Sequence, residues 1–576
     1  MKNTFDKENG NSVMSRREWL GKLALPATGA VLAASFCDGK SAVAQPSLTH
    51  SPSDLGVRVY NIRNYGAKGD KTTLDTEALQ AAVDACTGDG GGTVLVPAGV
   101  FVIGTVELKS NVTLHIAAGG TLLGSGDGKH YHAVDAIPLH GDTTLNDGNW
   151  ALLFAVKVKN VTIEGPGTID GQGAQFHSAV RGTPPPSGLG GNKRPYHILV
   201  HQSENFSVRN ISLLDCAYHS IRIIESQRIY LDGIYIHNRV NGNNDGFHFI
   251  SDEHVTVSNC VVKSGDDACA MFGSCRYITV TNSYFSTRWS VFRFGGGHAG
   301  DIAISNCVLR EVYGCPIKFQ GDPGSVLENI SFSGLVLDDV TGPISISVGK
   351  GRRRPGDQTL PDPLPPVVVR NIAFSNIHGT VTTNPPHQLS ESTLGVGGRP
   401  GEGHSAIVLN AIDDAVLENI SFDNVHLTFG GGGTAEEAAR RDVPKVFGEY
   451  FELGPIPAYG LYARNARGIT LTNVRFQVST PDLRPAVVFD HVEDAVFNGF
   501  SVQGNIDAES VLRFIDSKQA LITAARVLTP ASPFLQLEGE ANERITVEGG
   551  DLSHAASVVA FKSGATEKSV KLRNVS

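Results

Sequence analysis

The chain has little methionine, few cysteines and no long apolar segment past its N-terminal region. Its 576 residues include 3 Met and 8 Cys, and no CxxC pair or His/Cys cluster has the spacing of a metal site. Seven cysteines remain past Cys37, an odd number that cannot all pair within one chain. These absences argue against a disulfide-stapled scaffold, a cysteine-ligated metal domain and a membrane-spanning protein. We expect neither a metal nor a cofactor.

The chain also has fewer basic than acidic residues. The whole chain carries a formal net charge of −10, with 48 Lys and Arg against 58 Asp and Glu. Without the first 44 residues, which hold 6 basic and 4 acidic side chains, the balance is 42 − 54 = −12. A mildly acidic chain argues against nucleic acid as the main partner. It leaves acidic polysaccharides open, because local basic clusters can bind them.

The N-terminus is typical of an export signal. Arg16-Arg17 stand in a segment that resembles a twin-arginine motif, an apolar stretch runs from Leu23 to Phe36, and a small-residue cleavage site ends at Ala44. We therefore expect residues 1–44 to be a twin-arginine signal peptide and 45–60 to be a linker. The protein would then be periplasmic or secreted. The alternative is an N-terminal membrane anchor, which the short apolar stretch disfavours.

A short pattern recurs along the chain: alternating apolar and polar residues, then Asn or Gly, then an apolar residue. A period in the twenties indicates a solenoid, and alternation with period two makes each unit a strand with one face inward. Asn and Gly suit a turn that needs left-handed backbone angles. Copies begin at Phe206, Ile229, Val255, Ile278, Ile302 and Ile330, with gaps of 23, 26, 23, 24 and 28 residues.

These repeats predict an all-β fold, a single right-handed parallel β-helix of the pectin-lyase-like type over residues 61–576. Strands of three to six residues are expected, with Cys260 and Cys307, which share one repeat position, pointing inward. An amphipathic helix over Asp75–Cys86 should cover the N-terminal end of the solenoid. Long insertions should gather on one face and wall a groove; they are Gly171–His197, Lys350–Pro366, Thr380–His404 and Gly430–Tyr459.

Two acidic motifs interrupt the repeats, Asn243-Asn244-Asp245-Gly246 and Gly265-Asp266-Asp267. Asp245 and Asp266 are 21 residues apart, close to one coil, and so should lie level on neighbouring coils. Carboxylates this close raise at least one pKa, which keeps an acid protonated beside an ionised base, as glycoside hydrolysis requires. The alternative is structural, since both motifs also favour turns.

With these motifs, the chain resembles glycoside hydrolase family 28, the polygalacturonase and rhamnogalacturonase family. The likeness extends from Asn64-Tyr65-Gly66-Ala67-Lys68-Gly69-Asp70 to the late repeats. The family carries N-T-D, then G-D-D, then G-H-G, then R-I-K. By that match Asp266 would be the general acid, and Asp245 and Asp267 would activate the water in an inverting reaction. The resemblance thus implies an enzyme, acting as a monomer on a pectic or related acidic polysaccharide or oligosaccharide.

The last two motifs depart from the family. Gly297-His298-Ala299 comes about ten residues too late for G-H-G, and Arg288-Trp289-Ser290 occupies that position instead. Cys315-Pro316-Ile317-Lys318 replaces R-I-K and retains only the lysine. Relatives that cleave rhamnogalacturonan also lack this histidine, so its loss leaves hydrolysis possible but questions a simple polygalacturonan specificity. His298 is expected either on the groove rim or as a solvated loop residue.

Several residues near the carboxylates are candidates for substrate binding. Arg288 and Arg293 could hold a uronate carboxylate in a fork, and Lys318 could do so as a point charge. Trp289 would stack on a sugar ring or pack under a loop. Asn243, which opens the first motif, completes the expected set.

Two other functions remain open. Polysaccharide lyases and uronate epimerases share this fold, and Lys318 or an arginine could serve as their base, with the aspartates as calcium ligands. A catalytically inactive β-helix that only binds glycans is the third possibility. Products distinguish the three, because a lyase leaves an unsaturated sugar, a hydrolase leaves a new reducing end, and a binding protein leaves the glycan intact.

Overall fold

The computed structural model describes residues 58–134, 149–178, 183–350, 364–392, 394–396, 399 and 401–575. The expected signal peptide, with Arg16-Arg17, and most of the expected linker lie outside these residues. Within them, no helix is long and apolar enough to cross a membrane.

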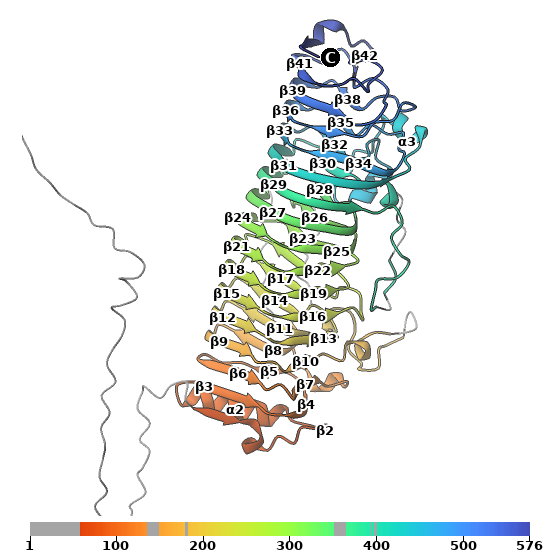
Figure 1. The fold of residues 1–576 in the computed structure, drawn as a ribbon. Coiled ribbons are helices and arrows are strands. Elements are labelled where there is room, and N and C mark those ends of the chain that lie inside the picture. The colour runs from red at the N-terminus through yellow and green to blue at the C-terminus, as the bar shows by residue number, and fades with distance from the viewer. Residues whose placement is uncertain are drawn as a thin grey trace, which may run out of the picture. The chain divides into compact units, whose positions relative to one another are not determined.

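Successive coils stack with every strand parallel to its neighbour in the next coil (Figure 1). One coil consists of β15 (Gln227–Asp232), β16 (Tyr235–Asn238) and β17 (Phe247–Ile250). These strands pair in parallel with β18 (Glu253–Ser258), β19 (Val261–Ser264) and β20 (Cys269–Phe272) of the next coil. The result is three walls around one core, and the expected right-handed parallel β-helix is confirmed.

The third wall, a 15-stranded sheet, carries the acidic motifs at the start of two of its strands. Its neighbouring strands follow the order of the chain, from β5 to β42. They are β5 (Val106–Glu107), β8 (Ala151–Val156), β11 (Tyr196–His201), β14 (Ile221–Ile224), β17, β20, β23 (Ser290–Gly295), β26 (Cys315–Gln320), β28 (Ile344–Val348), β30 (Ile407–Ala411), β32 (Leu461–Arg464), β35 (Val487–Asp490), β38 (Leu512–Ile515), β40 (Leu535–Glu538) and β42 (Val559–Lys562).

The other two walls join where strands are longer than expected. β27 (Val326–Thr341), β29 (Val368–Val381) and β31 (Val416–Gly431) each run around a corner, so a limit of six residues is wrong for them. The corner of β27 is Gly334, whose φ of 66° is left-handed. Pairing continues on both sides of it, from Ser333–Ser375 to Leu335–Ile377, because the aligned corners of adjacent coils keep the ladder in register.

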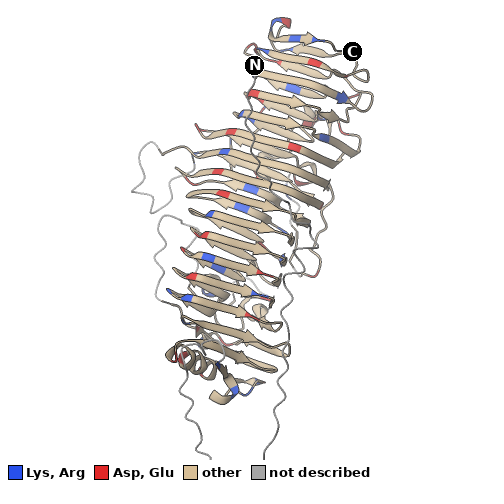
Figure 2. Ribbon diagram, turned by 60° about the vertical axis from the view of Figure 1, so that its left-hand side comes forward, with Lys and Arg blue, Asp and Glu red and all other residues tan. Residues whose placement is uncertain are grey.

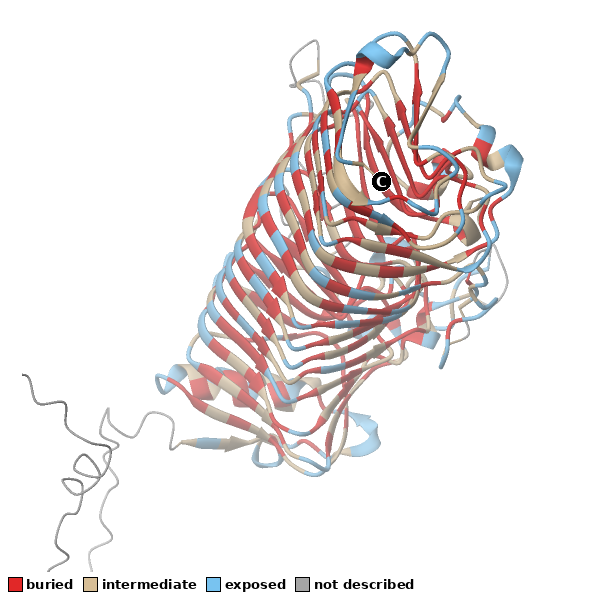
Figure 3. Ribbon diagram, turned by 45° about the horizontal axis from the view of Figure 1, so that its top comes forward, coloured by how far each residue is buried: buried red, intermediate tan, exposed pale blue. Residues whose placement is uncertain are grey.

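The repeats form strands that end in left-handed turns, as the sequence predicts. The Asn or Gly after each strand adopts a left-handed φ, for example 52° at Asn210, 64° at Gly233 and 56° at Asn259. Apolar positions of the repeats point into the core, and Cys260 and Cys307 are both buried there. Figure 3 shows the resulting alternation of buried and exposed positions along the coils.

A helix covers the N-terminal end of this core. α2 (Thr76–Gly88) packs against the first coils and buries Leu79, Val83 and Cys86 completely, so the expected capping helix is confirmed with shifted ends. Asp75 lies just outside it, because its carboxylate accepts the backbone N–H groups of Lys68 (2.7 Å) and Gly69 (3.0 Å). These two hydrogen bonds hold the preceding loop against the start of the helix.

Candidate active site

Two turns bring the three aspartates together at the start of β17 and β20. The backbone N–H of Gly246 donates to the carbonyl of Asp267 (2.9 Å), and Phe247 pairs with Cys269. Counting back two residues on each coil, Asp245 therefore lies level with Asp267, one residue beyond Asp266, which the spacing placed at about the same angular position. The coil repeat is 22 residues at this point, and a bend at Gly265–Asp266 takes Asp266 out of the ladder.

The first turn is shaped by Asn244, which is fully buried. Its side chain accepts the N–H groups of Val240 and Asn241 and donates to the carbonyls of Cys216 and Tyr218. Its backbone carbonyl also accepts the N–H groups of Gly265 and Asp266 (3.0 and 3.2 Å). One asparagine thus links both acidic turns.

Asp266 is the half-buried member of the group. Its Oδ1 accepts the N–H of Asp267 (2.9 Å), and Asn243 Nδ2 lies 3.5 Å from its Oδ2. Burial, followed by the charges of Asp245 and Asp267, raises the pKa of Asp266 well above its ordinary value. A carboxyl that keeps its proton beside ionised carboxylates has the property of a general acid.

Asp267 is paired with Arg293 of the next coil. Arg293 Nη1 donates to Asp267 Oδ2 (3.0 Å), and Nη2 donates to Gln320 Oε1 (3.0 Å). Burial opposes the charge on Arg293, but the carboxylates of Asp267 and Glu449 raise its pKa. The other oxygen, Asp267 Oδ1, is buried without a hydrogen-bond partner among the described residues. This oxygen therefore has unused acceptor capacity in the second acidic turn.

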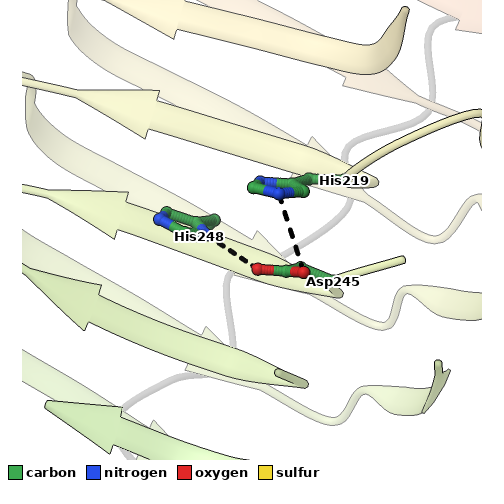
Figure 4. A group of neighbouring side chains, drawn as sticks. All are labelled: His219, Asp245 and His248. Carbon is green, nitrogen blue, oxygen red and sulfur yellow. Dashed lines mark hydrogen bonds and ion pairs between the residues drawn. The ribbon is translucent and has the colours of Figure 1, made fainter. Parts of the chain in front are cut away.

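Asp245 lies beside two stacked histidines (Figure 4). His248 donates its Nδ1–H to Asp245 Oδ2 (2.8 Å), and His219 Nε2 lies 3.6 Å from Oδ1. The two imidazole rings are 4.6 Å apart, and His248 also stacks on Phe272 at 5.1 Å. Burial, and then the neighbouring His248, hold the pKa of His219 well below its ordinary value, so this ring is neutral.

These three side chains also have the composition of a metal site. Their ligand atoms lie within 4.8 Å of one another, and two imidazoles with one carboxylate suit a transition metal. In the structure, however, the Nδ1–H of His248 is used in the hydrogen bond to Asp245. That hydrogen bond accounts for the contact between His248 and Asp245.

Lys318 is on the same wall, beside Arg293 in the register of β23 and β26. It is completely buried, and its Nζ donates to both oxygens of Glu449 (2.8 and 3.1 Å). Burial opposes ionisation of Glu449, but Lys318 and Arg293 keep its pKa below the ordinary value. The lysine expected to bind a substrate carboxylate is therefore already paired with a carboxylate of the protein.

The other predicted residues on this face contact the insertions. Arg288 donates to the carbonyls of Gly265 (2.9 Å) and Gly395 (3.0 Å), so it joins the second acidic turn to the Thr380–His404 insertion. Trp289 has Arg399 over its ring at 4.1 Å and Lys318 at 4.7 Å. Two of the expected insertions thus wall this face, since Glu449 belongs to Gly430–Tyr459.

His298 is not brought to this group by any contact among the described residues. It starts β24 (His298–Ser305), in the first wall, and its half-exposed ring bonds Glu328 Oε1 at 2.9 Å. It is a strand residue rather than a loop residue. The structure instead adds His219, His248 and Glu449. His248 could have been noticed, because it lies three residues after Asp245; Glu449 could not, because it lies 131 residues from Lys318.

The comparisons with known proteins agree with this geometry. Residues 86–393 match the model of glycosyl hydrolases family 28. An exo-poly-alpha-D-galacturonosidase of Dickeya chrysanthemi is 25% identical over 434 residues, covering 64% of this chain and 71% of that protein. An exopolygalacturonase of Zea mays is 25% identical over 339 residues, covering 56% and 77%.

A solved structure shares the fold. The family 28 exopolygalacturonase of Yersinia enterocolitica superposes with a TM-score of 0.54 at 18% identity, covering 76% of this chain and 78% of that one. The family match spans more than half of the chain, including both acidic turns. The chain therefore belongs to glycosyl hydrolases family 28.

Proposed function

We propose that this protein hydrolyses galacturonosidic linkages of a pectic glycan with inversion at the anomeric carbon. The observation that carries the proposal is the raised pKa of Asp266 between two partnered carboxylates. The names of the related enzymes support galacturonic acid as the sugar.

In this mechanism Asp266 delivers its proton to the leaving glycosidic oxygen. Asp245 and Asp267 orient a water on the opposite side of the sugar and take its proton as it attacks. The water adds its oxygen to the anomeric carbon, and the leaving sugar departs with the proton of Asp266. Arg293 bonds Asp267 Oδ2 and His248 bonds Asp245 Oδ2, so each carboxylate is held in place through one of its oxygens.

The test is turnover of galacturonate oligomers by the purified protein and by Asp266→Asn. We expect a new reducing end of inverted configuration by NMR, and a loss of about 10²–10⁴-fold in kcat for the variant with folding intact. An amide cannot supply the proton, whereas it preserves the shape of the protonated acid. Retained configuration, or full activity in Asp266→Asn, contradicts the assignment.

The ion pair at Lys318 disfavours the lyase alternative. A lyase base must be neutral and reach the sugar, whereas Lys318 is buried and bonded to Glu449. An unsaturated product that absorbs in the ultraviolet would support the lyase alternative. An unchanged glycan would support the alternative of a protein that only binds glycans.

We also propose that the protein is exported from the cytoplasm before it acts on its substrate. The Arg16-Arg17 pair with its apolar stretch supports twin-arginine transport, cleavage near Ala44 and an enzyme that acts outside the cytoplasm. Replacing Arg16-Arg17 with Lys-Lys should keep the uncut chain in the cytoplasm. Normal export of that variant contradicts the twin-arginine assignment.

A further inference from the structure

The pair formed by Lys318 and Glu449 lies on the face that carries the aspartates. Ala270, Arg293 and Lys318 occupy the same register position on β20, β23 and β26. Lys318 is thus two strands beyond the coil of Asp267, or about 10 Å at the usual strand spacing. A glycan chain lying along this face would place the sugar next to the cleaved bond near Lys318.

Lys318 has no free charge to offer that sugar. Its ammonium group is completely buried and donates to both oxygens of Glu449. Glu449 also accepts Gln320 Nε2 (3.3 Å), and Gln320 accepts Arg293, which itself holds Asp267. An incoming uronate carboxylate would have to displace Glu449 and leave one negative charge buried without its partner.

The position of Glu449 is built into the fold. The preceding Gly448 donates its N–H to the carbonyl of Ser347 (3.3 Å). The following Tyr450 is buried, and its hydroxyl bonds Thr341 Oγ1 (3.2 Å) and Glu402 Oε1 (3.3 Å). Both neighbours fix the backbone, so the carboxylate is delivered to Lys318 by a rigid segment.

The adjoining pocket is also unfavourable to anions. A cavity of about 740 Å³ opens beside Arg293 and Gln320. Its lining contains the carboxylates of Asp322, Asp413 and Glu452, against the cations Arg293 and Lys445. Arg293 is already paired with Asp267, so negative charge prevails in this pocket.

We propose that Glu449 makes the binding position over Lys318 selective for an uncharged sugar, either a neutral pyranose or a galacturonate whose carboxyl is methyl-esterified. This inference rests on the proposed function, since it names one unit of the pectic substrate. The carboxylate of Glu449 neutralises the charge of Lys318 and repels a carboxylate of the substrate. The oxygens of Glu449 and the amide of Gln320 remain suited to sugar hydroxyls.

The test compares galacturonate oligomers with their methyl esters, in which each carboxylate is replaced by an uncharged ester that is larger by one methyl group. The variant is Glu449→Gln, which keeps an acceptor for Lys318 but removes the negative charge. The matched control is Glu436→Gln, the same change at an exposed position of the same insertion. Charges elsewhere on the substrate act equally in all three proteins, so the ratio of ester to acid kcat/KM isolates the position over Lys318.

We expect the wild type and Glu436→Gln to share one ratio, and Glu449→Gln to shift it toward the free acid by about tenfold, the value of one charged hydrogen bond. An unchanged ratio in Glu449→Gln overturns the proposal. Affinities measured by calorimetry in the Asp266→Asn background give a second readout that needs no turnover. If the wild type cleaves neither oligomer, the proposed function fails, whereas the calorimetric ratio still decides the role of Glu449.

Discussion

His248 Nδ1 lies 2.8 Å from Asp245 Oδ2, so a buried imidazole orients one of the carboxylates that would activate the water. We expect His248→Phe to lower kcat by about 10–100-fold with little change in KM, because the ring packing survives but the donor is lost. His248→Gln, which can still donate, should recover part of the rate. Steady-state kinetics of both variants check this, and an unchanged kcat in His248→Phe would show that Asp245 needs no such support.

Asp266 should make stability depend on pH. Its pKa is raised in the folded state, so the folded protein binds its proton more tightly than the unfolded chain does. Its favourable contribution is therefore complete below the ordinary Asp pKa and is lost as the pH rises through the raised value. Asp266→Asn does not titrate, and its melting temperature relative to wild type should increase between acidic and neutral pH.

The difference in unfolding free energy should grow by about 1–2 kcal/mol over that interval. Thermal unfolding of both proteins at a series of pH values measures it. A difference that stays constant with pH would mean that the carboxyl of Asp266 titrates normally.

Arg293 should influence the upper pH limit of activity. Its charge lowers the pKa of Asp266, although burial and the two other aspartates dominate. Arg293→Gln should therefore move the alkaline limb of kcat/KM upward by about one pH unit. It should also destabilise the protein by about 3–5 kcal/mol, because Asp267 is left buried and unpaired. A pH–rate profile with an unmoved alkaline limb would contradict the coupling.

Gly246 is required by the close approach of two coils. A Cβ on it would lie 2.4 Å from the carbonyl oxygen of Ala268, whereas a Cβ on Gly242 in the same loop would meet nothing within 4 Å. Gly246→Ala should therefore cost about 1–3 kcal/mol of stability and displace Asp245, with loss of activity. Gly242→Ala is the control. Equal melting temperatures for the two variants would contradict this account.

Much of the fold could be predicted from the sequence, because its determinants are local. Alternation of apolar residues sets which face of each strand is buried, and an Asn or Gly at each corner supplies the left-handed angle that turns the coil. A fixed period then stacks identical corners, as at Gly233 and Asn259. The corner-spanning β27 was missed, since continuity of a ladder depends on the alignment of neighbouring coils rather than on one segment.

In the candidate site, too, some features follow from the sequence and others depend on the fold. The sequence alone determined that Asp245, Asp266 and Asp267 meet, since one coil of spacing and a bend bring them together. The contacts of each carboxylate and cation depend on the folded arrangement: Asp245 is level with Asp267, His298 lies on another wall, and Glu449 reaches Lys318 across 131 residues. The physical reason is that charge pairing acts through space, and an insertion delivers its residues to a coil that its position in the chain does not reveal. Charged residues of both signs lie along the coils (Figure 2), and their pairing is set by that stacking.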